Sequence, residues 1–119
     1  MAPVAVPELS VVVVVLAGGP HLARCLEVLG RQAPMESRQP GAPPVEVIVP
    51  HDESLLELDS LRQRFPEVRF LYCAGRRTYA ELRAAGVRAA RGRLVAITED
   101  QSIPPEQWCA NIVAAHAQP

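Results

Sequence analysis

A run of valine and leucine from Leu9 to Leu16 constrains the fold of this 119-residue chain more than any other feature. Apolar, β-branched runs without regular polar alternation are typical of strands that are buried on both faces of a parallel sheet. The apolar stretch Leu9–Ala17 is also far shorter than the about 20 residues that a membrane-spanning helix needs. We therefore expect Leu9–Leu16 to form the central strand of a buried sheet.

Strand-like and helix-like patterns alternate along the rest of the chain. Further apolar runs predict strands at Val45–Val49, Val68–Leu71 and Arg93–Ile97. Apolar residues at helical spacing, or an alanine-rich composition, predict helices at Leu22–Arg31, Leu55–Phe65, Tyr79–Arg91 and from Pro104 to about Ala117. This strict alternation indicates one α/β domain over residues 1–119, with a Rossmann-like, doubly wound and mainly parallel sheet.

Prolines, glycines and short polar residues predict where these elements end. Pro50 is expected to close the second strand, and Asp52 or Ser54 can cap the helix that follows. Gly92 stands where a glycine often caps the C-terminus of a helix. Pro104 is expected in the first turn of the last helix, a position that suits proline.

Composition and charge exclude several classes of protein. Hydrophobic residues make up 49% of the chain and charged residues 21%, as in folded soluble proteins rather than disordered ones. The net charge of -1 gives no electrostatic basis for binding nucleic acid or an anionic membrane. The start of the chain lacks the basic region of a secretory signal. We expect a soluble, cytoplasmic protein without a transmembrane segment.

The cysteines and histidines form no pattern that predicts a metal site, a disulfide or a catalytic triad. The cysteines lie far apart, with no CxxC pair, at Cys25, Cys73 and Cys109. We expect them to be reduced and to serve as small buried apolar side chains. We expect loop or surface positions for the histidines, which are His21, His51 and His116.

Polar and glycine residues gather where the predicted strands end. These places are Leu16–Gly19, Pro50–Ser54, Ala74–Thr78 and Thr98–Gln101. In parallel sheets ligands bind beyond the carboxyl ends of the strands, so the pattern predicts one ligand-binding edge. The fourth place holds two adjacent carboxylates, Glu99 and Asp100, which suit a hard cation such as Mg²⁺ or Mn²⁺. The alternative is a strand end that is acidic because it is exposed.

The segment from Arg91 to Trp108, RGRLVAITEDQSIPPEQW, resembles the strand and acidic motif of family 2 inverting glycosyltransferases with the GT-A fold. Pro7–Leu16, with Cys25-Leu26 and Gln32 downstream, is similar to the first strand and helix of that family. Pro44–Ser54 resembles its second strand, and Tyr79–Gly92 resembles its third helix. The resemblance covers essentially the whole chain. It implies the nucleotide-sugar-binding half of a glycosyltransferase.

The resemblance also implies a ligand set. A UDP- or GDP-linked sugar would bind together with Mn²⁺ or Mg²⁺, with Asp100 as the metal ligand and Glu99 near the ribose. Gln101 is the alternative ligand position, although a neutral amide is a poorer ligand than a carboxylate. Asp52 would accept the ring N–H of uracil or its equivalent, unless it serves only as a helix cap.

Two further features of the donor site are expected with alternatives left open. The first strand ends in Ala17, Gly18 and Gly19 where the family usually has Pro-Thr-Tyr-Asn, so the backbone can approach a ligand closely or simply turn. Arg77 and Arg83 lie near the start of the third helix, where a guanidinium can pair with a diphosphate. The alternative for both is an ordinary exposed arginine.

The reaction implied by the resemblance needs more than this chain supplies. The metal would neutralise the departing nucleoside diphosphate, and a carboxylate base would deprotonate the acceptor hydroxyl. That base comes from the second half of the family domain, so we assign no catalytic residue and expect the chain alone to be inactive. We favour a fragment of a longer enzyme over a remnant, and we expect self-association through an uncovered sheet edge.

Two other functions fit less well. A non-catalytic nucleotide-binding or protein-interaction module with a Rossmann-like fold is the main alternative. A receiver-like domain is disfavoured, because it needs acidic residues after the first strand and a lysine late in the chain, and the sequence contains no lysine.

Overall fold

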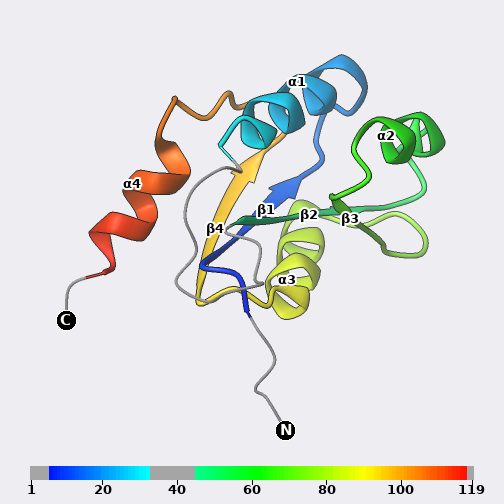
Figure 1. The fold of residues 1–119 in the computed structure, drawn as a ribbon. Helices are drawn as coiled ribbons and strands as arrows, with labels where there is room; N and C mark the ends of the chain where they lie inside the picture. Colours follow the sequence, from blue (N-terminus) through cyan, green and yellow to red (C-terminus); the bar gives the residue numbers. More distant parts are fainter. Residues whose placement is uncertain (1–5, 33–44, 118–119) are drawn as a thin grey trace, which may run out of the picture.

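A computed structural model describes residues 6–32 and 45–117 of the chain. Within them, all strands run parallel in the order β3-β2-β1-β4, with bounds β1 Leu9–Val14, β2 Val45–His51, β3 Arg69–Tyr72 and β4 Leu94–Glu99. The helices that alternate with them are α1 Gly19–Gly30, α2 Leu58–Arg64, α3 Tyr79–Ala89 and α4 Trp108–Ala115. Figure 1 shows β1 in the interior of the sheet. The predicted α/β, doubly wound architecture and the central first strand are confirmed.

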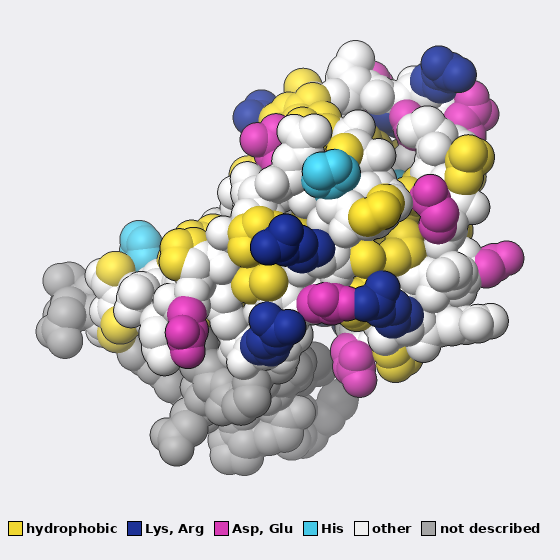
Figure 2. Space-filling view, turned by 90° about the horizontal axis from the view of Figure 1, so that it is seen from above, with side chains coloured by type: hydrophobic (Ala, Val, Ile, Leu, Met, Phe, Trp, Pro, Cys, Tyr) yellow, Lys and Arg dark blue, Asp and Glu magenta, His cyan; other side chains and the backbone are white. Residues whose placement is uncertain are grey.

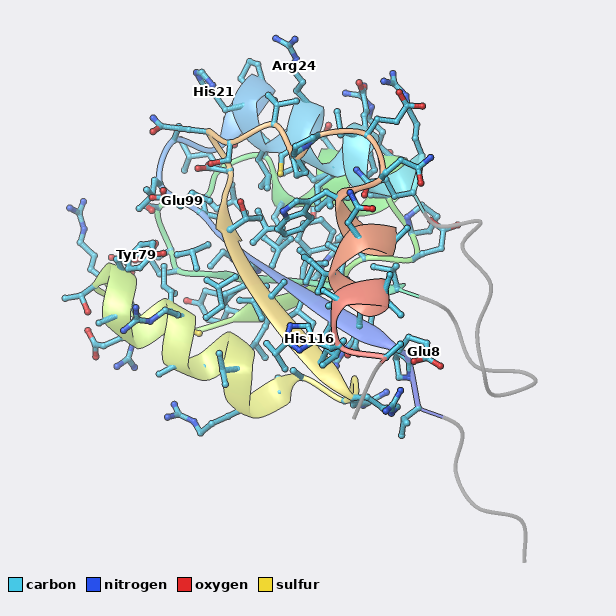
Figure 3. The ribbon with its side chains drawn as sticks, turned by 90° about the vertical axis from the view of Figure 1, so that its left-hand side faces the viewer. Glu8, His21, Arg24, Tyr79, Glu99 and His116 are labelled. Atoms are coloured by element: carbon cyan, nitrogen blue, oxygen red, sulfur yellow. The ribbon has the colours of Figure 1, made fainter. Side chains whose placement is uncertain are left out.

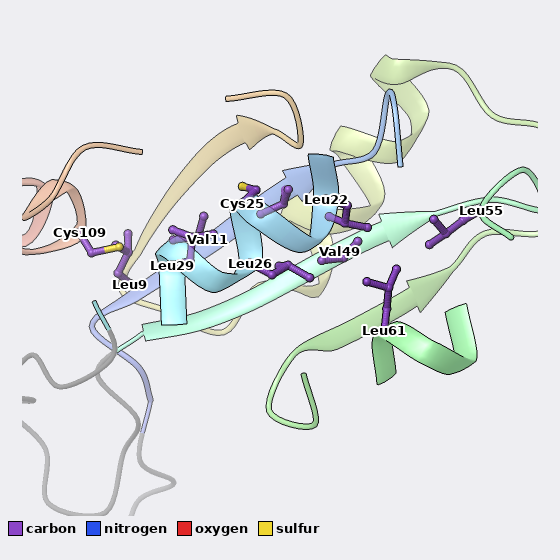
Figure 4. Packing of buried hydrophobic residues seen from close by; sticks show 11 residues of the cluster. Leu9, Val11, Leu22, Cys25, Leu26, Leu29, Val49, Leu55, Leu61 and Cys109 are labelled. Carbon is purple, nitrogen blue, oxygen red and sulfur yellow. The ribbon is translucent and has the colours of Figure 1, made fainter. Parts of the chain in front are cut away.

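The side chains of β1 alternate between two helical layers. Val11 lies in a core cluster with buried leucines of α1 and α2 (Figure 4). Val13 belongs to the same cluster, and Trp108 of α4 packs against it. Val12 and Val14 point to the other face and pack with Leu82 of α3. Because both faces are covered, every residue of β1 is buried, as the valine run predicts.

The second strand does not end at Pro50, contrary to the prediction. The β1–β2 pairing stops at Ile48, while β2 continues beside β3 and pairs Pro50 with Leu71 and His51 with Tyr72. Proline disrupts a strand that has partners on both sides, because it lacks the N–H group. Pro50 is tolerated here because β2 has only β3 as a paired neighbour at this point.

The predicted start of α2 is also wrong. The helix begins at Leu58, and its N-cap residue Glu57 makes no capping hydrogen bond through its side chain. Asp52 and Ser54 lie too early to cap it, and their side chains bond to each other instead. Leu55 is buried in the core before the helix begins, so its apolar position reflects a packed loop rather than a helical face.

The last helix begins at Trp108 rather than at Pro104. The carbonyl of Pro105 accepts the backbone N–H of Trp108 at 3.0 Å, and Gln107 has a φ of 71°. The two prolines therefore lie in a turned segment before α4. Ile112 and Val113 of α4 are half-buried and pack against the core cluster.

Gly92 does not cap α3, because the C-cap residue is Ala90. A Cβ atom at Gly92 would come within 2.6 Å of the backbone nitrogen of Ser10. The N–H of Gly92 donates to Ser10 Oγ at 2.8 Å. Glycine is needed here because the turn before β4 passes directly against β1.

The three cysteines are free thiols. Cys25 and Cys109 are buried, as predicted, whereas Cys73 is half-buried. Burial raises the pKa of the Cys109 thiol to about 11. The pKa of Cys25 is also raised to about 11, by burial and then by the charge of Asp100. Both buried thiols are therefore protonated near neutral pH.

His51 is buried at the end of β2, which corrects the expectation of a surface or loop position. Its ring lies edge-on to Phe70 at 6.3 Å and tilted against Tyr72 at 5.8 Å, between ring centroids. Its Nε2 atom has no hydrogen-bond partner among the described residues. Burial lowers the pKa of His51, so the imidazole is neutral in the folded protein near neutral pH.

This burial predicts a loss of stability in mild acid. Because the folded-state pKa of His51 lies below the unfolded value, the unfolded chain takes up the proton first as the pH falls below about 6.5. Urea unfolding between about pH 8 and about pH 5 should show the free energy of unfolding decreasing through this window. The His51→Phe variant should show a flatter dependence, and His21→Gln, at an exposed position, should not. Equal slopes in all three proteins would contradict the prediction.

Within the described part of the chain, none of the helices combines the length and apolar character needed to cross a membrane.

Candidate functional site

The carboxyl ends of β1 and β4 are joined by the carboxylate of Asp100, which follows β4 directly. Asp100 Oδ1 accepts backbone N–H groups from Leu16 at 3.0 Å and Ala17 at 3.2 Å. Its Oδ2 accepts them from Ala17 at 2.9 Å and Gly18 at 2.6 Å. Gly18 has a φ of 70°, which lets these successive amides converge on one anion. The loop after β1 is therefore organised around Asp100.

The predicted metal role of Asp100 does not fit this geometry. A carboxylate offers about four acceptor positions, and the contacts with the β1 loop use them all. The residue is 0% exposed. Glu99 is half-buried and Gln101 is exposed, whereas Asp100 is fully buried beneath the β1 loop. Among the described residues there is no group of three or more His, Cys, Asp or Glu side chains that could hold a metal ion.

Asp52 joins the end of β2 to the start of α3. Its Oδ1 accepts the N–H of Ser54 at 2.9 Å and the Ser54 hydroxyl at 2.6 Å, and its Oδ2 accepts the N–H of Arg77 at 2.8 Å. These bonds, led by the Ser54 hydroxyl, lower the pKa of Asp52 to about 2. The charged carboxylate keeps one acceptor position on Oδ2 that no described residue fills.

The two predicted arginines lie in different settings. Arg77 is held at the rim of the edge, where its Nε donates to the carbonyl of Ala74 at 2.8 Å and its Nη1 lies 3.3 Å from Glu81. Arg83 is exposed on α3, with its guanidinium carbon 5.7 Å from the ring centroid of Tyr79. The structure thus brings Arg77, but not Arg83, to the group around Asp52.

A cavity of about 220 Å³ opens at this edge, between the loops that follow β1 and β2 and the start of α3. Apolar walls come from Val15, Leu16, Leu55, Tyr79 and Leu82, and polar atoms come from Asp52, Ser54 and Arg77. Described basic and acidic side chains are interspersed with hydrophobic ones on the face seen from above in Figure 2. The parallel strands therefore end at one edge of the sheet, which holds a hollow lined by one carboxylate and several apolar side chains.

Sequence reasoning missed the apolar walls and the capping of α3. Tyr79 and Leu82 are three residues apart at the start of α3, so helical spacing could have placed both on the inner face. Thr78 and Glu81 form a capping box, in which each side chain bonds to the other residue's backbone N–H. The pattern Thr-x-x-Glu is the signal that marks this helix start in the sequence.

The comparison with known proteins agrees with this architecture. The family described as Glycosyl transferase family 2 matches residues 10–119, which is nearly the whole chain. No curated protein matches the chain. The match spans every strand and helix of the parallel α/β fold from β1 onward. The chain therefore belongs to glycosyl transferase family 2.

Proposed function

We propose that the cavity beside Asp52 binds the nucleoside of a nucleotide-sugar donor, and that uridine fits it better than guanosine. Proteins of this family bind such donors. The observation that carries the proposal is the charged Asp52 carboxylate, which lines the cavity with one acceptor position left on Oδ2. Uracil presents one ring N–H between two carbonyl groups, which matches one acceptor. Guanine presents adjacent N–H donors that would need a second acceptor, and Ser54 fills both positions on Oδ1.

The remaining donor contacts follow from the lining of the cavity. Leu16, Leu55 and Tyr79 supply apolar surface for a planar base. Arg77 supplies a cation at the rim that can meet the diphosphate. Glu99 remains the proposed ribose contact, at the same end of the sheet as Tyr79 (Figure 3). Ala17 and Gly18 would contribute by shaping the loop, since their N–H groups already bind Asp100.

The family generally uses a divalent metal. Asp100 does not fit that role here, so we propose that it positions the β1 loop rather than a cation. Mn²⁺ or Mg²⁺ remains an expectation from the resemblance, and a cytoplasmic location remains an expectation from the sequence composition. A non-catalytic nucleotide-binding module is the second candidate function, and the engaged state of Asp100 favours it.

Calorimetry with UDP and GDP tests this proposal directly. We expect UDP to bind more tightly than GDP, and Asp52→Ala to weaken UDP binding about tenfold or more, because a hydrogen bond to a charged group is lost. Asp59→Ala, on the exposed side of α2, is the matched control and should bind like the original protein. Leu16→Glu places a charge in the apolar wall without touching the bonds of Asp52, and it should also weaken binding. Equal UDP affinity in all four proteins would refute the site.

Adding Mg²⁺ or Mn²⁺ separates the two candidate functions. A donor site that uses metal should gain UDP affinity when the ion is added. A module that recognises only the nucleoside should show the same affinity with and without the ion.

A further inference from the structure

Among the described residues that line the cavity beside Asp52, Tyr79 is the one aromatic side chain. It is the first residue of α3 and is half-buried (Figure 3). The other apolar walls of the cavity are aliphatic, and they come from Val15, Leu16, Leu55 and Leu82. Tyr79 is therefore the wall of the cavity that offers a flat ring to a flat ligand.

Two sets of hydrogen bonds fix the start of α3, and with it Tyr79, relative to Asp52. The N–H of Arg77 donates to Asp52 Oδ2 at 2.8 Å. In the capping box that follows, Thr78 N lies 3.0 Å from Glu81 Oε1, and Glu81 N lies 3.2 Å from Thr78 Oγ1. The Tyr79 ring thus has a defined position beside the carboxylate that is the acceptor of the proposed nucleoside site.

Arg83 lies over one face of the Tyr79 ring, with its guanidinium carbon 5.7 Å from the ring centroid. Residues four positions apart on a helix lie one above the other, and Arg83 is one turn nearer the C-terminus. The opposite face of the ring is therefore turned toward the start of α3, where Arg77 bonds to Asp52. A cation over one face of an aromatic ring is attracted to it, so Arg83 favours this orientation of the ring.

We propose that Tyr79 stacks on the base of the nucleotide, and that Arg83 is a positioning residue that acts through the Tyr79 ring. This inference rests on the proposed nucleoside site and adds a second basis for recognition at that site. Asp52 accepts an N–H group from the edge of the base, whereas Tyr79 contacts its face. Stacking on an aromatic side chain requires the π face of an aromatic base, so Tyr79 selects against ligands whose ring is saturated.

A modified ligand separates stacking from hydrogen bonding. In dihydro-UDP the C5–C6 double bond of uracil is saturated, so the base keeps its ring N–H between two carbonyl groups but is no longer aromatic or flat. Calorimetry with the original protein should show UDP binding about tenfold more tightly than dihydro-UDP, as expected for the loss of base–aromatic stacking. This comparison needs no substitution, so it does not depend on the folding of a variant. Equal affinities for the two ligands would overturn the proposal.

Substitutions of Tyr79 test the same contact from the protein. Tyr79→Leu should weaken UDP binding about tenfold and change dihydro-UDP binding far less, whereas Tyr79→Phe keeps the ring and should bind UDP like the original protein. Tyr72→Leu is the matched control, because Tyr72 is 56% exposed on β3 and does not line the cavity. Loss of UDP affinity in Asp52→Ala but not in Tyr79→Leu would overturn the stacking and leave the nucleoside site in place. No UDP binding by the original protein would overturn both.

Variants of Arg83 test whether it acts through the ring. Arg83→Met removes the cation and should weaken UDP binding about twofold to fivefold, the effect of a lost cation–π contact at an exposed site. Arg83→Lys keeps a cation and should bind UDP nearly as the original protein does. In a Tyr79→Leu protein, Arg83→Met should have no further effect, because the ring through which it acts is gone. An equal loss with and without Tyr79 would show that Arg83 contacts the ligand directly, and would contradict the positioning role.

Discussion

Replacing Glu46 with alanine is expected to lower the free energy of unfolding by about 3 kcal/mol, because several hydrogen bonds to a buried carboxylate are lost together. Glu46 Oε1 accepts Arg69 Nη1 at 2.5 Å, and its Oε2 accepts the Ser10 hydroxyl at 2.6 Å and the N–H of Arg91 at 3.0 Å. The carboxylate thereby joins β1, β2, β3 and the turn before β4 at the amino end of the sheet. Burial opposes its charge, but these hydrogen bonds and the charge of Arg69 keep the pKa of Glu46 below its usual value.

Chemical denaturation measures this effect, with Glu53→Ala as the matched control. Glu53 pairs with Arg76 at 3.7 Å on the surface, where both side chains are largely exposed, so its removal should change stability by at most about 1 kcal/mol. Glu46→Gln keeps the shape of the side chain and one acceptor oxygen. Its loss of stability should lie between those of Glu46→Ala and Glu53→Ala. A Glu46→Ala protein as stable as Glu53→Ala would show that the buried network contributes little.

Replacing Asp100 with alanine is expected to lower the free energy of unfolding by about 3 kcal/mol, because hydrogen bonds to a charged group are lost and a buried N–H is left unpaired. The loss falls on the amides of Leu16, Ala17 and Gly18, of which the Gly18 bond is buried. The loop after β1 should also become mobile. Hydrogen exchange of these three amides should speed up more than that of the amides in α1.

Glu99→Gln is the control for Asp100. It changes the neighbouring carboxylate, whose side chain accepts no N–H group from the β1 loop, and its effect should stay within about 0.5 kcal/mol. If Asp100→Ala unfolds no more easily than Glu99→Gln, then Asp100 does not organise the loop. That result would favour the role predicted from the sequence, in which Asp100 is a metal ligand.

The order and type of the elements could be predicted from the sequence because each depends on a local pattern. The valine run of β1 shows burial on both faces, and Leu22, Leu26 and Leu29 at helical spacing mark the buried face of α1. The element ends could not be predicted, because pairing decides them. Whether Pro50 ends β2 depends on which neighbour lies beside it, and no local signal in the sequence contains that information.

The sequence predicts where the candidate site lies in the fold, but it does not predict what each residue of the site does. Parallel topology alone brings the ends of β1, β2 and β4 to one edge. The partner of each carboxylate depends on loop geometry: Asp100 turns to the amides after β1, and Asp52 turns to Ser54 and Arg77. Sequence spacing places both carboxylates at the edge, yet it does not show which one keeps an acceptor position for a ligand.

The central claim is that the edge beside Asp52 is a nucleoside site. The most direct measurement is an NMR titration of the ¹⁵N-labelled chain with UDP, which reports on each backbone amide separately. The account predicts shift changes at Leu16, Ser54, Arg77 and Tyr79, which border the cavity, and unchanged signals at Glu46 and Arg69 at the opposite end of the sheet. Unchanged amides around the cavity at millimolar UDP, or changes centred on another surface, would contradict it.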